Sequence, residues 1–201
     1  SNVAATITTT ADAVDFGTGG VTLTDASSVS TAGGNITFGG DILGGLDLTL
    51  DGGAAGAIAV AGNSTVNDLT VTNSNGATFT GTVTANDITL SDTTDGQTVS
   101  FLDAVTANDL ITTANGYLVS MTGTGNSFVA NVDFLNTGDV TLGDATADTF
   151  AFNGGLNFTG NAASNVAATI TTDGDAVDFG TGGVTLTDDA SVSTAGGNIT
   201  F

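Results

Sequence analysis

Aspartate is the residue of this sequence with the most potential for chemistry. The chain has 201 residues, all of its 21 acidic residues are Asp, and it contains no Lys, Arg, His or Cys, so its net charge is −21. An Asp directly precedes a short apolar segment at five places, which are Asp47, Asp68, Asp87, Asp109 and Asp139. Three of these five share the string Asn-Asp-Leu or Asn-Asp-Ile. This recurrence indicates that Asp has a fixed position in a repeated structural unit.

The spacing of these residues suggests one carboxylate per unit. From Asp47, the steps to Asp68, Asp87 and Asp109 are 21, 19 and 22 residues, so these four could form a column. Carboxylates stacked about 4.8 Å apart repel by roughly 0.9 kcal/mol per neighbour even in bulk water. One hypothesis is that Ca²⁺ or a similar hard cation bridges Asp68, Asp87 and Asp109. The alternative is that they are solvated turn residues that accept backbone N–H bonds.

Catalysis is not expected from these residue types. General acid–base chemistry could use only Asp or Tyr117, and no His, Lys or Arg is present to complete a Ser triad or to stabilise an oxyanion. Two carboxylates can hydrolyse glycosides, but Asp188-Asp189 is the only adjacent pair. Its counterpart in the repeat described below is Asp25-Ala26, so the pair is not reproduced. The sequence predicts a non-enzyme with no required cofactor.

The same composition argues against other partners. Nucleic-acid binding needs Lys or Arg against phosphate, and an anionic membrane surface would repel this chain. No run of 18 or more apolar residues is present, so no transmembrane helix is expected. Hydrophobic residues nevertheless make up 40% of the chain, which is enough to build a core. We therefore expect a folded protein without nucleic-acid partners or membrane insertion.

A long internal repeat dominates the organisation of the chain. Residues 164–201 repeat residues 1–38 at an offset of 163, without a gap. Only four of the 38 positions differ, namely Thr10/Asp173, Ala11/Gly174, Ala26/Asp189 and Ser27/Ala190. We interpret residues 1–163 as one tandem repeat and residues 164–201 as the start of the next. The whole of 1–201 is expected to be one continuous segment of a larger repetitive array.

A shorter repeat lies inside the long one. Apolar–small polar–apolar triplets such as Val21-Thr22-Leu23 and Leu48-Thr49-Leu50 recur with period two, which is typical of strands. Gly-Gly and Asn-Gly pairs separate them and indicate tight turns. The spacing predicts an all-β, right-handed parallel β-helix, or β-solenoid, of 20–22 residues per coil, with roughly eight coils per long repeat. An antiparallel sandwich, or a row of them, is the alternative.

The solenoid prediction makes specific statements about the core. Leu48, Leu69 and Ile88 should lie above one another in successive coils. Most Phe residues should be buried and stacked along the axis. Tyr117, the only Tyr, follows Asn-Gly and is expected to be a surface or turn residue.

Two strings, GGNITFGGDI (33–42) and GGLDLTLDGG (44–53), carry a resemblance to a known family. They resemble the repeats of filamentous-haemagglutinin-type adhesins and other giant bacterial surface β-helix proteins. The resemblance implies a secreted, elongated, cell-surface or fibrous role, and it implies no binding residues. We therefore expect a structural segment of an extracellular fibre or stalk, in which the array continues end to end or associates with itself. The alternatives are an adhesin region that binds a receptor or a glycan, and tandem sandwich-type extender domains.

Overall fold

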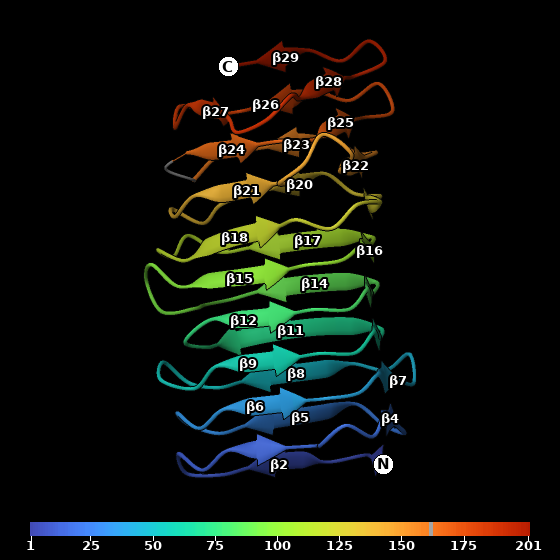
Figure 1. Cartoon of the computed structure of the whole chain (residues 1–201), viewed down its shortest axis with the longest axis vertical. Coiled ribbons are helices and arrows are strands. Elements are labelled where there is room, and N and C mark those ends of the chain that lie inside the picture. Colours follow the sequence, from blue (N-terminus) through green and yellow to red (C-terminus); the bar gives the residue numbers. More distant parts are fainter. Residues whose placement is uncertain (161–162) are drawn as a thin grey trace.

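The chain forms a β-solenoid of about nine turns, in which short strands stack in register from the N-terminus to the C-terminus (Figure 1). This is a computed structural model, and it describes residues 1–160 and 163–201. The described residues contain 29 strands and no helix. Each turn contributes one strand to each of three parallel sheets. The prediction of an all-β solenoid is confirmed.

The three sheets run along the length of the molecule. Sheet A contains β1 (Asn2–Val3), β4 (Val21–Leu23), β7 (Ile42–Leu43), β10 (Ser64–Thr65), β13 (Val83–Thr84), β16 (Val105–Ala107), β19 (Asn126–Phe128), β22 (Thr149–Phe152), β25 (Thr169–Thr171) and β28 (Ser191–Ser193). Sheet B contains β2 (Thr6–Thr8), β5 (Ser27–Ser30), β8 (Leu48–Asp51), β11 (Asp68–Asn73), β14 (Asp87–Leu90), β17 (Asp109–Thr112), β20 (Val132–Asp133), β23 (Leu156–Asn157), β26 (Val177–Asp178) and β29 (Ile199–Thr200). Sheet C contains β3 (Val14–Asp15), β6 (Ile36–Phe38), β9 (Ile58–Val60), β12 (Ala77–Phe79), β15 (Thr98–Phe101), β18 (Leu118–Met121), β21 (Val140–Leu142), β24 (Ser164–Val166) and β27 (Val184–Leu186).

The register gives the length of a coil. Along sheet C, eight coils separate Val14 from Val184, which is a spacing of about 21 residues per coil. In sheet B, Leu69 pairs with Leu48 on one side and with Ile88 on the other, as predicted. The pairings of the described strands are parallel. The antiparallel sandwich alternative is therefore wrong.

Glycine permits the tight corners between sheets. Gly44 has a φ of +131°, a conformation that residues with a side chain rarely adopt. A Cβ atom at this position would lie 2.4 Å from the backbone oxygen of Leu23 in the coil below. The Gly-Gly pair at 44–45 thus marks a place where the chain turns while the preceding coil lies close against it.

The core is a continuous apolar interior with stacked aromatic rings. The longest column joins Phe134, Phe158, Phe179 and Phe201, with ring centroids 5.2, 5.4 and 5.2 Å apart. Such stacking adds to the free energy gained by burial, by about 0.5–1.5 kcal/mol per pair. Of these four rings, only Phe201 at the end of the column is exposed to solvent.

Tyr117 corrects one sequence prediction, because it is fully buried rather than a surface residue. Its hydroxyl donates a hydrogen bond to the backbone oxygen of Leu90 at 2.8 Å and accepts one from the backbone N–H of Thr113 at 3.1 Å. Burial raises the pKa of this phenol. The residue follows Asn-Gly, but it directly precedes β18 and shares the inward alternation of Val119. A buried hydroxyl with two partners is compatible with the core.

The two copies of the repeated sequence lie on different sheets. Residues 2–3 form β1 in sheet A, whereas their equivalents 165–166 lie in β24 of sheet C. The long repeat therefore spans 23 strands, which is seven turns and two strands rather than eight whole turns. Each copy is thus turned by one third of a turn about the axis relative to the copy before it.

Candidate functional site

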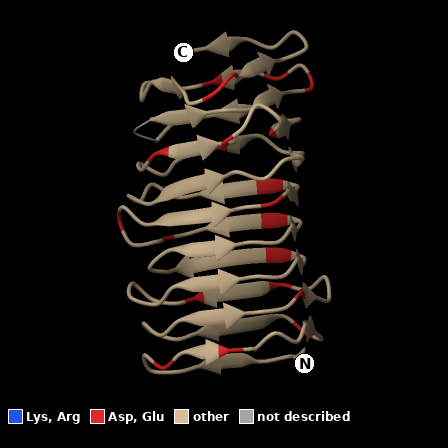
Figure 2. Cartoon of the chain, viewed as in Figure 1, with Lys and Arg blue, Asp and Glu red and all other residues tan. Residues whose placement is uncertain are grey.

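The predicted Asp column is present at the start of three neighbouring strands of sheet B. Asp87 pairs in register with Asp68 below it and with Asp109 above it. Figure 2 shows these acids stacked at the beginnings of β11, β14 and β17. Asp47 precedes β8 in the same sheet and extends the column downward. Asp139 precedes β21 and therefore belongs to sheet C instead.

A ladder of Asn side chains accompanies the carboxylates. The Asn that precedes each Asp donates its Nδ2–H to the Asp of the coil below. The three bonds run from Asn67 to Asp47 at 2.7 Å, from Asn86 to Asp68 at 3.1 Å and from Asn108 to Asp87 at 3.0 Å. Asp68 also accepts the backbone N–H of Asp87 at 3.3 Å. Hydrogen bonds from the next coil therefore offset part of the repulsion within the column.

The Asn partners were not anticipated from the sequence, although the recurring Asn-Asp string contained the signal. Because coils are about 21 residues apart, an Asn next to one Asp lies within reach of the Asp one coil earlier. The bonds favour the alternative of hydrogen-bonded acids, but Asp68, Asp87 and Asp109 are each the first residue of a strand and not part of a turn. They show that amide groups, as well as backbone N–H groups, satisfy the carboxylates.

Asp109 ends the column in a different environment. Burial raises the pKa of its carboxyl, the neighbouring Asp87 adds to this effect, and a hydrogen bond with the backbone of Leu110 opposes it. In the next coil, Asn131 occupies the position before the strand and accepts a hydrogen bond from Asn157 Nδ2 at 3.4 Å. The charged form of Asp109 is thus disfavoured, and its carboxyl titrates differently from an ordinary exposed Asp.

The fit of this column to a metal ion is limited. In residues 1–160 and 163–201, no group of three or more Asp, Glu, His or Cys side chains is arranged to hold one ion. A cation at Asp68, Asp87 or Asp109 would have to rely on fewer carboxylates than hard divalent ions commonly use. The inter-coil Ca²⁺ ladder therefore stays a prediction.

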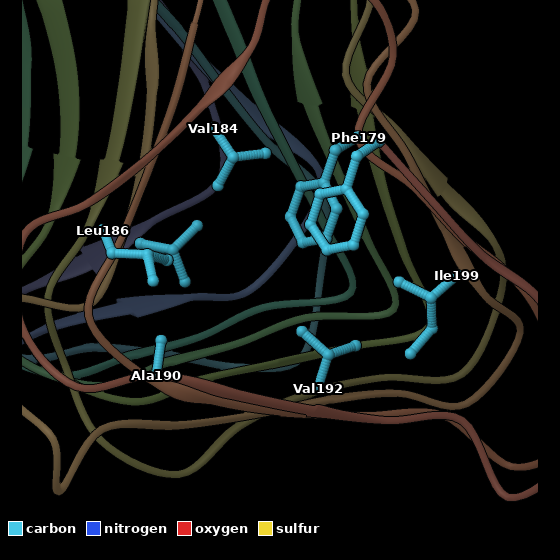
Figure 3. A pocket seen from close by; sticks show the side chains of 8 residues that line it. Phe179, Val184, Leu186, Ala190, Val192 and Ile199 are labelled. Atoms are coloured by element: carbon cyan, nitrogen blue, oxygen red, sulfur yellow. The ribbon is translucent and has the colours of Figure 1, made fainter.

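The C-terminal end of the solenoid is the second distinctive region. It is an apolar hollow at the last described coil, and Figure 3 shows its side chains bordering a common space with two stacked phenyl rings on one side. The residues labelled there are Phe179, Val184, Leu186, Ala190, Val192 and Ile199. Leu186 is 65% exposed, and Phe201, which also lines the hollow, is 79% exposed. These residues belong to the last described coil, whereas the equivalent Leu23 and Phe38 are buried beneath a following coil.

Comparison with protein-family models, curated proteins and solved structures gives no match to this chain. The fold alone therefore defines the class, which is a parallel β-solenoid built from tandem repeats and compatible with a β-helix repeat protein. Among the described residues, no helix could span a membrane.

Proposed function

We propose that this chain is a non-catalytic structural segment of a secreted, repetitive extracellular fibre or stalk. The observation that carries the proposal is that the second copy of the repeat joins the same three sheets as the first. Strands β24 to β29 add to sheets A, B and C in the same cyclic order as β1 to β23. A repeat that continues the fold of the preceding one suits a structural protein whose function depends on reaching a great length.

The physical properties of such a segment suit a spacer. Each coil rests only on its two neighbours, so coils can be added without a new core. Backbone hydrogen bonds run along the axis, and at about 4.8 Å per turn, nine turns give a rod roughly 40 Å long. A continuous dry interior makes the rod stiff. We infer that the array continues end to end or associates with itself.

The negative charge of the chain supports an extracellular role that involves neither nucleic-acid binding nor membrane insertion. A net charge of −21 keeps neighbouring rods apart in solution. The absence of Lys and Arg leaves no trypsin sites, which suits an exposed fibre. The resemblance to filamentous-haemagglutinin-type repeats supports the same bacterial cell-surface location. A role as the passenger region of an adhesin is the competing function.

Electron microscopy of the intact protein that carries this array tests the proposal. Long filaments of uniform width are expected. Single stalks that end in a globular head would favour the adhesin. Compact particles without an elongated part would contradict both the fibre and the stalk.

Calcium has its own test, because the proposed rod does not depend on it. If Ca²⁺ bridges Asp68, Asp87 and Asp109, added Ca²⁺ should raise the melting temperature and a chelator should reverse the rise. The variant Asp87→Asn should lose this response, whereas Asp173→Asn, an exposed control outside the column, should keep it. A melting temperature that neither Ca²⁺ nor chelator changes would end the calcium hypothesis.

A further inference from the structure

The outer face of sheet B carries a column of hydroxyl side chains that stops at β17. Over five successive coils, the outward position in the middle of the strand is occupied by Thr6, Ser28, Thr49, Thr70 and Thr89. The next two coils place Ile111 and Asp133 at this position instead. This part of the rod therefore has a surface that the repeated pattern of sheet B does not explain.

A side chain interrupts the ladder between β17 and β20 at the same place. These strands share one register pair, Ile111 with Asp133, whereas β14 and β17 share four. The hydroxyl of the buried Thr112 accepts the backbone N–H of Leu135 at 2.7 Å and donates to the backbone oxygen of Asp133 at 3.2 Å. A hollow of about 150 Å³ lies at this interruption, and its outward side chains are Asp109, Ile111, Asn131, Asp133 and Leu135.

The hollow has an acidic side and an apolar side. Because Ile111 is in register with Asp133, Asp109 is a diagonal neighbour of Asp133, and Leu135 is a diagonal neighbour of Ile111. With about 4.8 Å between strands and about 3.3 Å per residue, the Cα atoms of such diagonal neighbours are about 8 Å apart. Ile111 and Leu135 are 40% and 37% exposed. One side thus offers two carboxylates, and the other offers accessible aliphatic carbon.

Asp109 lacks the amide donor that serves the other acids of its column. The backbone N–H of Ala130 donates to the oxygen of Asn108 at 2.7 Å, just as that of Asn108 donates to the oxygen of Asn86 at 2.6 Å. Ala130 therefore has the position that Asn108 has one coil earlier. The side-chain amide of Asn108 bonds to Asp87, whereas Ala130 has no amide to offer to Asp109. A donor for the carboxylate of Asp109 is missing at this point of the ladder.

Asp133 also lacks a donor. Its Oδ1 atom is buried and has no hydrogen-bond partner within residues 1–160 and 163–201. The neighbouring amides of Asn131 and Asn157 bond to each other at 3.4 Å. A buried carboxylate oxygen without a donor costs free energy, and an N–H group from outside the chain would remove that cost. Both acids of the hollow can therefore gain from a cationic donor.

We propose that the hollow between β17 and β20 binds an arginine side chain of a different protein. The stem of arginine packs on apolar surface while its charged head stays with polar groups. Its guanidinium has five N–H donors and is more weakly hydrated than an ammonium, so it suits two carboxylates on neighbouring strands. A second copy of this chain cannot supply the group, because the chain contains no Lys or Arg. The site goes beyond the structural role and does not depend on it.

Two other occupants would behave differently. A Ca²⁺ ion takes about six to eight oxygen ligands, whereas only two carboxylates border the hollow, and Ile111 and Leu135 offer no oxygen from their side chains. General attraction between a chain of charge −21 and any basic molecule would be spread along the whole rod. At a salt concentration of about 0.15 M, that attraction is screened beyond about 8 Å. A direct contact in the hollow is screened less.

A peptide titration followed by NMR tests the proposal on the unaltered chain at about 0.15 M salt. The probe is a capped Gly-Gly-Arg-Gly-Gly peptide, and the control is the same peptide with citrulline, which has a similar shape but no charge. The arginine peptide should shift the amide signals of Ile111, Asp133 and Leu135 until they saturate, and the citrulline peptide should not. Equal shifts along all acidic edges of the rod would overturn the proposal.

Two pairs of variants test the two sides of the hollow. Asp133→Asn should weaken peptide binding roughly tenfold or more, because a hydrogen bond to a charged group is lost. Asp173→Asn removes an exposed charge elsewhere and should weaken binding less than about threefold. Ile111→Thr restores the hydroxyl column without a change of charge and should weaken binding roughly threefold or more. Leu102→Thr, at a leucine that is 46% exposed outside the hollow, should not weaken it. Equal effects within either pair would contradict the proposed site.

Calcium competition separates a side-chain site from a metal site. At equal ionic strength, Ca²⁺ should reduce binding of the arginine peptide no more than NaCl does. If Ca²⁺ alone shifts the amides of Ile111, Asp133 and Leu135 and blocks the peptide, the hollow is a metal site and the arginine proposal is wrong. A failure of the arginine proposal leaves the fibre role unchanged, because electron microscopy tests that role separately.

Discussion

Residues 21–38 and 184–201 are the same coil in two situations. Their sequences differ only at Ala26/Asp189 and Ser27/Ala190. In residues 21–38, Leu23 is 3% exposed and Phe38 is 1% exposed, whereas the equivalent Leu186 and Phe201 are 65% and 79% exposed. The preceding coil lies beneath both. What differs is the coil above, which is present over 21–38 and absent from the described residues over 184–201.

The difference shows that burial in this protein is a property of neighbours rather than of a coil itself. Residues 21–23 lie in sheet A, and their equivalents 184–186 lie in sheet C, so the same sequence is accepted by either sheet. A coil therefore encodes its own turns and its apolar alternation, but not its place around the axis. Stability should then depend on how many sides of a coil are covered.

Truncation of equivalent phenylalanines should give the largest difference between the two coils. Phe38→Ala removes a buried ring and leaves a cavity, so the free energy of unfolding should fall by about 3–5 kcal/mol. Phe201→Ala removes a ring that is mostly in solvent, and the loss should stay below about 1 kcal/mol. Denaturant unfolding of both variants measures the two values. Equal losses would mean that Phe201 is covered in solution, as it would be inside an oligomer.

Amide hydrogen exchange should separate the same two coils residue by residue. The N–H of Ile36 donates to the backbone oxygen of Ala57 in the next coil at 2.9 Å. The equivalent N–H of Ile199 faces the open edge of sheet B. In a chain that is cut after residue 201, Ile199 should exchange at least roughly 100-fold faster than Ile36, because no further coil has to open to expose it. Similar rates at low protein concentration would contradict the comparison.

The sequence predicted the local repeat better than the side-chain partners. Period-two triplets and Gly-containing turns were enough to place Leu48, Leu69 and Ile88 in one column, because a solenoid repeats the same local structure. The Asp column followed from the same spacing. The predicted number of coils per long repeat, roughly eight, was less accurate, because the repeat spans seven turns and two strands. Coils vary in length, so spacing alone does not reveal the missing third of a turn.

Side-chain partners depend on contacts between coils, and these are not visible in a linear pattern. Tyr117 was misplaced because its position after Asn-Gly indicated a turn, whereas the bond that holds its hydroxyl comes from Leu90, 27 residues earlier. The Asn–Asp bonds were missed for the same reason, since each joins residues about 20 positions apart.

The hydroxyl of Tyr117 makes its hydrogen bonds in the buried interior of a coil that is covered on both sides. The variant Tyr117→Phe measures how much these hydrogen bonds contribute to the free energy of unfolding. The change leaves the oxygen of Leu90 and the N–H of Thr113 without the phenol. The free energy of unfolding should fall by about 1–3 kcal/mol, because buried polar groups lose their partner. Phe101→Leu, at another fully buried ring, is a control in which only apolar packing changes. Unchanged stability would mean that the oxygen of Leu90 and the N–H of Thr113 are satisfied without the hydroxyl of Tyr117.

The smallest expected effect concerns the pH dependence of stability that Asp109 causes in the Asp column of the middle coils. The pKa of Asp109 is raised above its usual 3.8, chiefly by burial, so the folded chain binds this proton more tightly than the unfolded chain does. The stability that this proton contributes is present at low pH and is lost as pH rises through the raised pKa. Asp109→Asn removes that loss. Its stability relative to the unaltered chain should therefore increase between about pH 3 and pH 7, by less than about 1 kcal/mol because solvent screens the half-buried carboxylate. A stability difference between Asp109→Asn and the unaltered chain that stays constant over this pH range would show that burial does not shift the titration of Asp109.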